Sequence, residues 1–300
     1  MEALQTFLDD AQARHGDHAV QVWAALIPWA ARLKPDAAGA EALRLAEHVG
    51  LGHCADGPGL RAFVQSLPAE LAQADATAVA VQRLRWSLST LALGGDAVAE
   101  LPRGQAWRSL QNVVLALARQ GRCAAAGVLL AAEEAAALAE GASDGGKAYA
   151  ATANNVAGHL QADRQDADAD ASAHSDRDAL MLQAAAIARR VWASAGNWMQ
   201  VERADYRLAL CHAVAGDGAG AVHHARLCLA ACVAAGEAAD AMEHFFAHEA
   251  LVRAHRARGT DGDAQAAETS RQTMQALMLQ IDEADGLRAW CAETMATVSR

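Results

Sequence analysis

A group of histidines in the last third of the chain has the spacing of a metal site. His244, His248 and His255 lie four and seven residues apart, which places them along one side of a helix, and His223 and His224 lie on the helix before it. Neutral imidazole is a common Zn²⁺ ligand. The repeat described below gives His248 and His255 packing positions, and half-buried histidines are common. We therefore favour packing roles, and keep a metal-dependent enzyme as an alternative.

An acidic run resembles the start of a calcium-binding loop. Asp166, Asp168 and Asp170 alternate as the first ligands of such a loop do. Ala171 replaces the glycine that the loop needs for its turn, and Arg177 stands where a bidentate glutamate is required. We expect this run to be a solvated insertion.

The chain carries no recognisable catalytic motif. It lacks the nucleophile elbow G-x-S-x-G, the phosphate-binding loop, the H-E-x-x-H zinc motif and the dinucleotide-binding glycine pattern. We expect a protein that is not an enzyme and that needs no cofactor.

Composition predicts an all-α fold. The 300 residues are 53% hydrophobic but only 4% aromatic, with five prolines, and alanine fills most element interiors. Alanine has the best helix propensity, whereas strands favour β-branched and aromatic residues. The six cysteines are scattered rather than framed as C-x-x-C, so we expect reduced thiols that pack as small apolar residues.

A repeat punctuated by glycine indicates how these helices are organised. Gly216 and Gly259 are 43 residues apart, and Gly121 precedes Gly216 by 95, which is 43 plus 52. One copy between them therefore has an insertion, which coincides with the acidic run. Each glycine is followed five residues later by an alanine: Ala126, Ala221 and Ala264. A period of this length is typical of helical arrays, in which each unit buries its apolar face against its neighbours.

The pattern around the glycines resembles the tetratricopeptide repeat. One copy carries the pair Leu208-Ala209, then Gly216, Ala221 and Cys228-Leu229, where the family has a large-small pair, a helix-ending glycine and small residues on the second helix. Another copy reads Asn154-Asn155-Val156-Ala157, similar to the long repeats of kinesin light chains. The resemblance covers roughly residues 105–282. It implies a right-handed α-solenoid of antiparallel helix pairs.

We expect one continuous array with three parts. Residues 1–103 form divergent helical hairpins, residues 104–282 form the tetratricopeptide-like repeats, and residues 283–300 form a capping helix. Helices are predicted at about 2–14, 18–33, 37–49, 58–66, 69–93 with a break, 104–119, 122–140, 147–162, 177–195, 199–215, 218–235, 238–258, 261–282 and 285–298.

The resemblance also predicts which residues line a concave groove, because the first helix of each pair faces inward in that family. The positions that match its inward stripe are Arg108, Gln111, Asn112, Arg119, Asn154, Asn155, Gln161, Arg203, Tyr206, Arg207, Phe246, Glu249, Arg253 and Arg256.

The charge of this predicted groove differs from that of the whole chain. Six arginines stand against one carboxylate in a chain of formal net charge −11. Guanidinium groups bind carboxylates through forked hydrogen bonds, and asparagine amides can hold an extended peptide backbone. We predict a protein-interaction scaffold that binds a peptide, an acidic segment or a C-terminal carboxylate. A helix face solvated by ordinary arginines, and a sensor of a small anionic ligand or signalling peptide, are the alternatives.

Charge and hydropathy limit the other partners. The acidic balance disfavours general nucleic-acid binding, and we see neither a signal peptide nor a membrane-spanning segment. We expect a cytoplasmic protein without nucleic-acid or membrane partners. Exposed apolar faces at the ends of the array could pair two copies of the chain.

Overall fold

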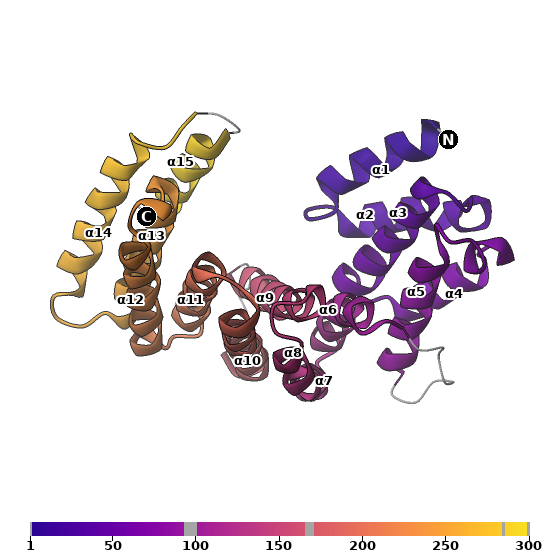
Figure 1. Ribbon diagram of the computed structural model, residues 1–300, viewed down its shortest axis with the longest axis horizontal. Coiled ribbons are helices and arrows are strands. Elements are labelled where there is room, and N and C mark those ends of the chain that lie inside the picture. Colours follow the sequence, from indigo (N-terminus) through magenta and orange to yellow (C-terminus); the bar gives the residue numbers. More distant parts are fainter. Residues whose placement is uncertain (1, 93–100, 166–170, 284–285, 299–300) are drawn as a thin grey trace. The chain divides into compact units, whose positions relative to one another are not determined.

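The computed structural model describes residues 2–92, 101–165, 171–283 and 286–298, and these ranges are helical apart from turns (Figure 1). They contain no β-strand. The prediction of an all-α protein is confirmed.

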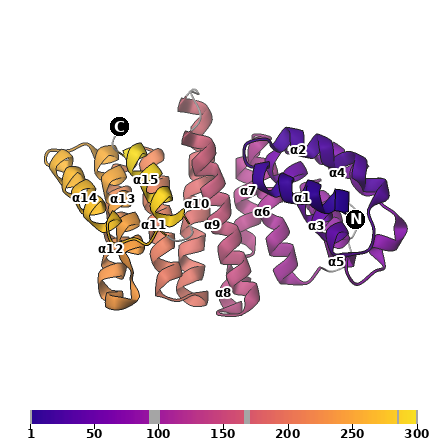
Figure 2. The ribbon, with the colours of Figure 1, turned by 90° about the horizontal axis from the view of Figure 1, so that it is seen from above.

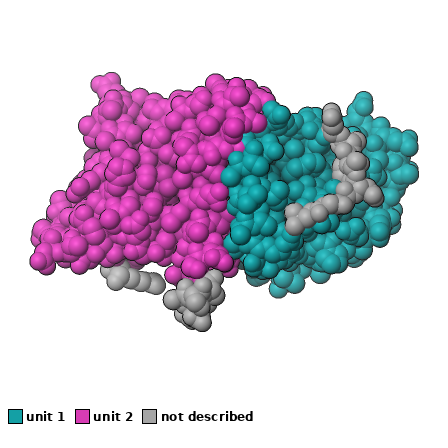
Figure 3. Space-filling view, turned by 90° about the horizontal axis from the view of Figure 1, so that it is seen from below, with its two compact units in different colours: residues 1–133 teal, residues 134–300 magenta. Residues whose placement is uncertain are grey.

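The chain divides into two compact units, an N-terminal unit of residues 1–133 and a C-terminal unit of residues 134–300 (Figure 3). This division differs from the boundary that we expected at residue 103, where the repeat pattern begins. The helix after that point contacts the preceding N-terminal helices, so the first predicted repeat copy falls mostly within the N-terminal unit.

The N-terminal unit is built from short and varied helices. In chain order they are α1 (Glu2–Arg14), α2 (Ala19–Leu26), η1 (Ile27–Arg32), α3 (Ala37–Leu45), η2 (Ala46–His53), α4 (Gly57–Gln65), η3 (Ala69–Ala72), α5 (Ala78–Leu91), α6 (Arg103–Arg119) and α7 (Cys123–Ala132). The helix predicted at 18–33 changes at Ile27 from α to 3₁₀, next to Pro28, which lacks a backbone donor. Helix α6 packs against α5, α7 and η2.

Element η2 departs from the helix that we predicted at 37–49. Helix α3 ends at Leu45, and the chain continues as a π-helix to His53. Ala55 follows with φ 51°, in the left-handed region that costs a non-glycine residue about 1–2 kcal/mol. Such segments persist only where their surroundings hold them. Here the Asp56 carboxylate caps α4 at Gly59 and accepts a hydrogen bond from Trp23 at 2.9 Å.

The C-terminal unit is more regular. Its elements are α8 (Glu134–Glu140), α9 (Asp144–Gln165), α10 (Ala171–Ala195), α11 (Trp198–Val214), α12 (Gly218–Ala235), η4 (Gly236–Ala238), α13 (Ala241–Arg258), α14 (Asp263–Met278) and α15 (Leu287–Val298). Successive helices from α9 to α15 contact one another, and α11 also contacts both α9 and α13 (Figure 2). The helix predicted at 122–140 is interrupted at Glu133, between α7 and α8.

The glycines of the repeat end helices, as predicted. Gly121, Gly216 and Gly259 have φ values of 73°, 80° and 61°, a conformation that glycine adopts without steric cost. After Gly216, the backbone N–H of Asp217 bonds to the carbonyl of His212 at 2.9 Å, which closes the end of α11. The same bond follows Gly121, from Arg122 to Leu117 at 2.8 Å.

The alanines of the repeat agree with the prediction in two copies of three. Ala126 and Ala221 are fully buried, but Ala264 is exposed, and Ala267 is buried instead. The reason is the longer turn before α14, which passes through a second left-handed glycine, Gly262, and delays the start of the helix to Asp263. The prediction of a packing role for Ala264 is therefore wrong.

One segment of the described chain, residues 218–238, is long and apolar enough to cross a membrane by length and composition, a test that a core helix of a soluble protein also passes. Helix α12, which makes up most of it, packs between α11 and α13. Its buried residues include Ala221, Ala225, Cys228 and Cys232.

Candidate functional site

The predicted groove residues are divided between the two units. Four of them lie on α6 in the N-terminal unit, and the others lie on α9, α11 and α13 in the C-terminal unit. Of those on α6, Arg108 is exposed and Gln111 is half-buried. On α9, Asn154 is half-buried and Asn155 is exposed.

The other two α6 residues hold the π-helix. Asn112 is buried, and its Oδ1 lies 3.2 Å from Nδ1 of His48. Arg119 donates a hydrogen bond to the backbone carbonyl of Gly52. Both side chains are therefore used within the N-terminal unit to fix η2.

The arginines of α11 bond to neighbouring helices. Arg203 forms an ion pair with Glu243 on α13, although its own side chain is 56% exposed. Arg207 donates to Oε1 of the buried Gln161 on α9 at 2.5 Å. These contacts tie α11 to α13 and to α9, and a carboxylate neutralises Arg203, whereas Arg207 bonds to a neutral amide.

A buried carboxylate on α13, itself one of the predicted residues, bonds to two of the others. Glu249 accepts hydrogen bonds from Tyr206 at 2.7 Å and from Arg253 at 2.6 Å. Burial, together with this carboxylate, raises the pKa of the Tyr206 hydroxyl well above its usual range, so tyrosine remains a donor. Arg253 also donates to Thr297 on α15 at 2.7 Å, which leaves its guanidinium in a fixed position.

An aromatic row crosses α11, α13 and α15. The ring centroids of Tyr206 and Phe246 are 6.0 Å apart, and those of Phe246 and Trp290 are 4.5 Å apart. Trp290 is 51% exposed. Trp290 was not among the predicted residues, because the last helix was expected only to cap the array and no spacing within the chain connects Trp290 with Phe246.

Next to Arg253 lies an apolar cleft of about 220 Å³, here called the arginine cleft. Arg256, which is exposed, contributes the second basic side chain. The lining residues are Leu210, Ala213, Val214, Arg253, Arg256, Ala257, Thr297 and Val298. Two of the predicted groove residues thus meet in a concave apolar surface.

Two buried acids were not part of the predicted groove and change its charge balance. Glu243 neutralises Arg203, and Glu202 on α11 accepts a hydrogen bond from the Cys228 thiol. Burial raises the pKa of Glu202 to about 7, and the neighbouring Glu243 contributes in the same direction. The excess of arginine charge that we inferred from the inward stripe is smaller once Glu243 is counted.

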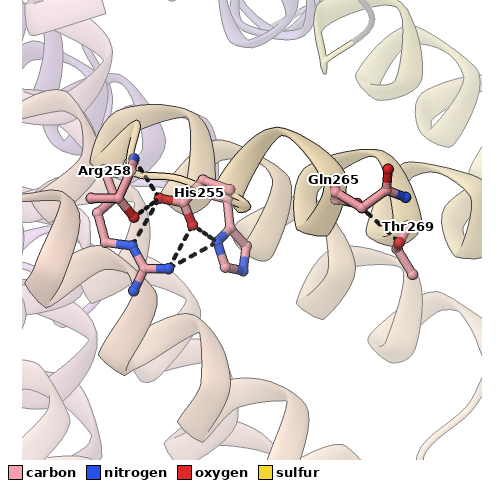
Figure 4. Close-up of polar contacts among 6 residues, drawn as sticks. His255, Arg258, Gln265 and Thr269 are labelled. Carbon is pink, nitrogen blue, oxygen red and sulfur yellow. Dashed lines mark hydrogen bonds and ion pairs between the residues drawn. The ribbon is translucent and has the colours of Figure 1, made fainter.

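Two histidines of the C-terminal unit bond to acids at helix starts. His255 and Arg258 converge on the Asp263 carboxylate, with the His255 Nδ1 at 2.5 Å (Figure 4). His212 makes the corresponding contact with Asp217 at 2.9 Å. Hydrogen bonds, first of all from Arg258, hold the pKa of Asp263 well below its usual range.

The histidines that the sequence suggested as a possible metal site do not form one within the described ranges; they are His223, His224, His244, His248 and His255. The one group of three metal-binding side chains found there is formed by His15, His48 and His53, which sequence analysis did not single out. The acidic triplet Asp166, Asp168 and Asp170 lies outside the described residues. Comparisons with protein-family models, with curated proteins and with solved structures gave no match.

Proposed function

We propose that this chain is a non-catalytic interaction scaffold of tetratricopeptide-like helix pairs, and that its C-terminal unit binds an acidic peptide segment ending in a carboxylate. Support for the repeat comes from the pairing of α9 with α10, α11 with α12 and α13 with α14, and from the contacts of α11 with α9 and α13. Tetratricopeptide repeats place their first helices next to one another in this way, and an α-solenoid is the arrangement that such stacking produces.

The observation that carries the binding proposal is the arginine cleft. Arg253 is oriented by Glu249 and Thr297, while Arg256 is exposed at the same cleft. Arginine forks bind carboxylates with two parallel hydrogen bonds, and an orienting partner reduces the entropy lost on binding. A volume of about 220 Å³ suits the end of a peptide rather than a whole helix.

The aromatic row offers a surface for the residues before that carboxylate. Phe246, Arg253 and Arg256 recur on α13 at spacings of seven and three, so they share one side of the helix. Trp290 on α15 extends this side next to Phe246. Exposed aromatic side chains are frequent anchors in protein interfaces, because they bury a large area at a small entropic cost.

The small-anion sensor has less support. A second cleft, of about 480 Å³, contains the basic side chains of Arg189, Arg190, His212 and His224. Each already has an acidic partner: Arg189 and His224 bond to Asp205, Arg190 to Glu134, and His212 to Asp217. An anion would have to compete with a carboxylate at every one of these side chains. At the arginine cleft it would compete with Glu249 for Arg253, but no ion pair among the described residues involves Arg256.

The test is peptide binding measured by fluorescence anisotropy. Acidic peptides with a free C-terminal carboxylate, and the same peptides amidated, are titrated with wild type and Arg256→Ala. We expect a loss of at least tenfold in affinity from amidation and from the substitution, and a decrease with salt. Arg226→Ala is the matched control, because Arg226 is exposed on α12 outside the cleft. Equal binding by wild type and Arg256→Ala would overturn the proposal.

A further inference from the structure

Three histidines converge in the N-terminal unit. His15 follows α1, and His48 and His53 belong to η2. One ring nitrogen of each lies within 4.8 Å of one from each of the others, and all three side chains are half-buried. The ring centroids are separated by 5.1 Å for His15 and His48, 5.5 Å for His15 and His53, and 4.7 Å for His48 and His53.

The π-helix is what aligns two of them. In an α-helix, residues five positions apart are separated by about 140° around the axis, so His48 and His53 would point in different directions. The i→i+5 hydrogen bonds of a π-helix instead stack residues five apart along one side. The irregular backbone of η2 therefore produces a pair of imidazoles that a regular helix would separate. Single π-helical turns are frequent at functional sites.

Hydrogen bonds orient two of the rings. Nδ1 of His15 lies 2.9 Å from the carbonyl oxygen of Gln12, and Nδ1 of His48 lies 3.2 Å from Oδ1 of Asn112. Both partners are oxygen acceptors, so the Nδ1 atoms donate and the Nε2 atoms carry the lone pairs. Ligating histidines are typically fixed in this way.

Gly52 leaves room for this arrangement. A Cβ at this position would lie 2.7 Å from Oδ1 of Asn112, closer than real Cβ contacts come. The backbone carbonyl of Gly52 also accepts the hydrogen bond from Arg119. The glycine thus allows α6 to approach η2 closely enough for the side-chain amide of Asn112 to reach His48.

The distance between two of the nitrogens fits a tetrahedral ion. Nε2 of His48 and Nε2 of His53 are 3.2 Å apart. Two imidazole ligands on a tetrahedral Zn²⁺, each at about 2.0–2.1 Å, would be separated by about 3.3–3.4 Å. In the metal-free protein this distance is a hydrogen bond from His53 to His48. Metal binding would require His53 to carry its proton on Nδ1 instead, a change of tautomer that releases no proton.

We propose that His15, His48 and His53 form a Zn²⁺ site, with Asn112 and the Gln12 carbonyl orienting the ligands. Three protein ligands leave a fourth position for water or for a ligand atom of a partner. The ion would join the end of α1 to η2, two segments that are distant in sequence.

The experiment is calorimetric titration of the full chain with ZnCl₂, together with NMR spectra of the histidine side chains. We expect one tight site in the wild type, with His15, His48 and His53 signals shifted. His48→Gln should lower the Zn²⁺ affinity at least 100-fold. Asn112→Ala should lower it about 10–100-fold, because the ligand would lose its orienting partner. His18→Ala is the control, because His18 is exposed near the same region and outside the cluster.

Several outcomes would overturn the proposal. They are the absence of a tight site in the wild type, unchanged Zn²⁺ affinity of folded His48→Gln, and an equal loss in His18→Ala. Circular dichroism establishes whether each variant is folded. The wild-type NMR titration decides the matter independently of any variant, since shifts confined to other histidines would place the ion elsewhere.

Discussion

The two units use their polar residues in different ways. In the C-terminal unit, long regular helices pair their charged groups with the neighbouring helix, as Arg203 does with Glu243 and Tyr206 with Glu249. In the N-terminal unit, the 3₁₀ and π segments and the left-handed Ala55 bring together side chains that regular geometry would separate, above all His48 and His53. Regular packing thus spreads contacts along a surface, whereas an irregular backbone can concentrate one kind of group at a point.

The largest expected effects test whether the units are separate folding units. Trp107→Ala and Phe245→Ala each remove a fully buried aromatic ring, one from each unit. We expect a loss of about 4 kcal/mol in unfolding free energy in each case. Trp107→Ala also removes the 3.0 Å hydrogen bond to Glu133. Hydrogen exchange should show reduced protection only in the unit that carries the substitution. Reduced protection in both units would mean that they unfold together.

The next effect concerns the close approach of helices in the C-terminal unit. A Cβ on Gly218 would lie 2.2 Å from the Cα of Arg258, which is backbone and cannot move aside cheaply. We expect Gly218→Ala to cost about 3 kcal/mol through overpacking, measured by urea denaturation. Gly16→Ala is the control, with nothing within 4 Å of its Cβ and an expected change below about 0.5 kcal/mol. Similar values for both would contradict tight packing at this turn.

The pH dependence of stability should reveal the buried acid of the C-terminal unit. The pKa of Glu202 is raised from 4.5 to about 7. Between these pH values the folded chain holds a proton that the unfolded chain releases, so stability falls as the pH rises through this window, by about 2 kcal/mol. Unfolding free energies measured from pH 4.5 to 7 should decline less in Glu202→Gln. The exposed Glu237, changed to Gln, is the control. An identical decline in wild type and Glu202→Gln would exclude Glu202 as the source.

The smallest effect locates strain in the N-terminal unit. Ala55→Gly removes the penalty of a left-handed alanine and should stabilise the chain by about 0.5–1 kcal/mol, although glycine gains entropy when unfolded. The same substitution at the exposed Ala230 of α12 should destabilise by about 1 kcal/mol. Thermal denaturation of both variants checks the opposite signs. A lower melting temperature for Ala55→Gly would show that Ala55 is not strained.

Prediction from sequence succeeded where local effects dominate. Helices at 199–215 and 218–235 match α11 and α12 closely, because Asn197 and Asp217 cap their starts and Gly216 ends the first. The prediction failed at η2, because the helix propensity of residues 46–53 does not distinguish a π-helix from an α-helix. The packing register of the fourth copy was also missed, since the turn through Gly262 has no counterpart in the other copies.

The sequence by itself determined the helical class, the glycines at which helices end and the side of α13 that carries Phe246, Arg253 and Arg256. These features depend on backbone propensity and on periodicity, which act over a few residues. Only the tertiary structure decided that Arg203 meets Glu243, that Trp290 extends the aromatic row and that His15 joins His48 and His53. Such contacts join residues from separate helices, and their geometry depends on how those helices pack.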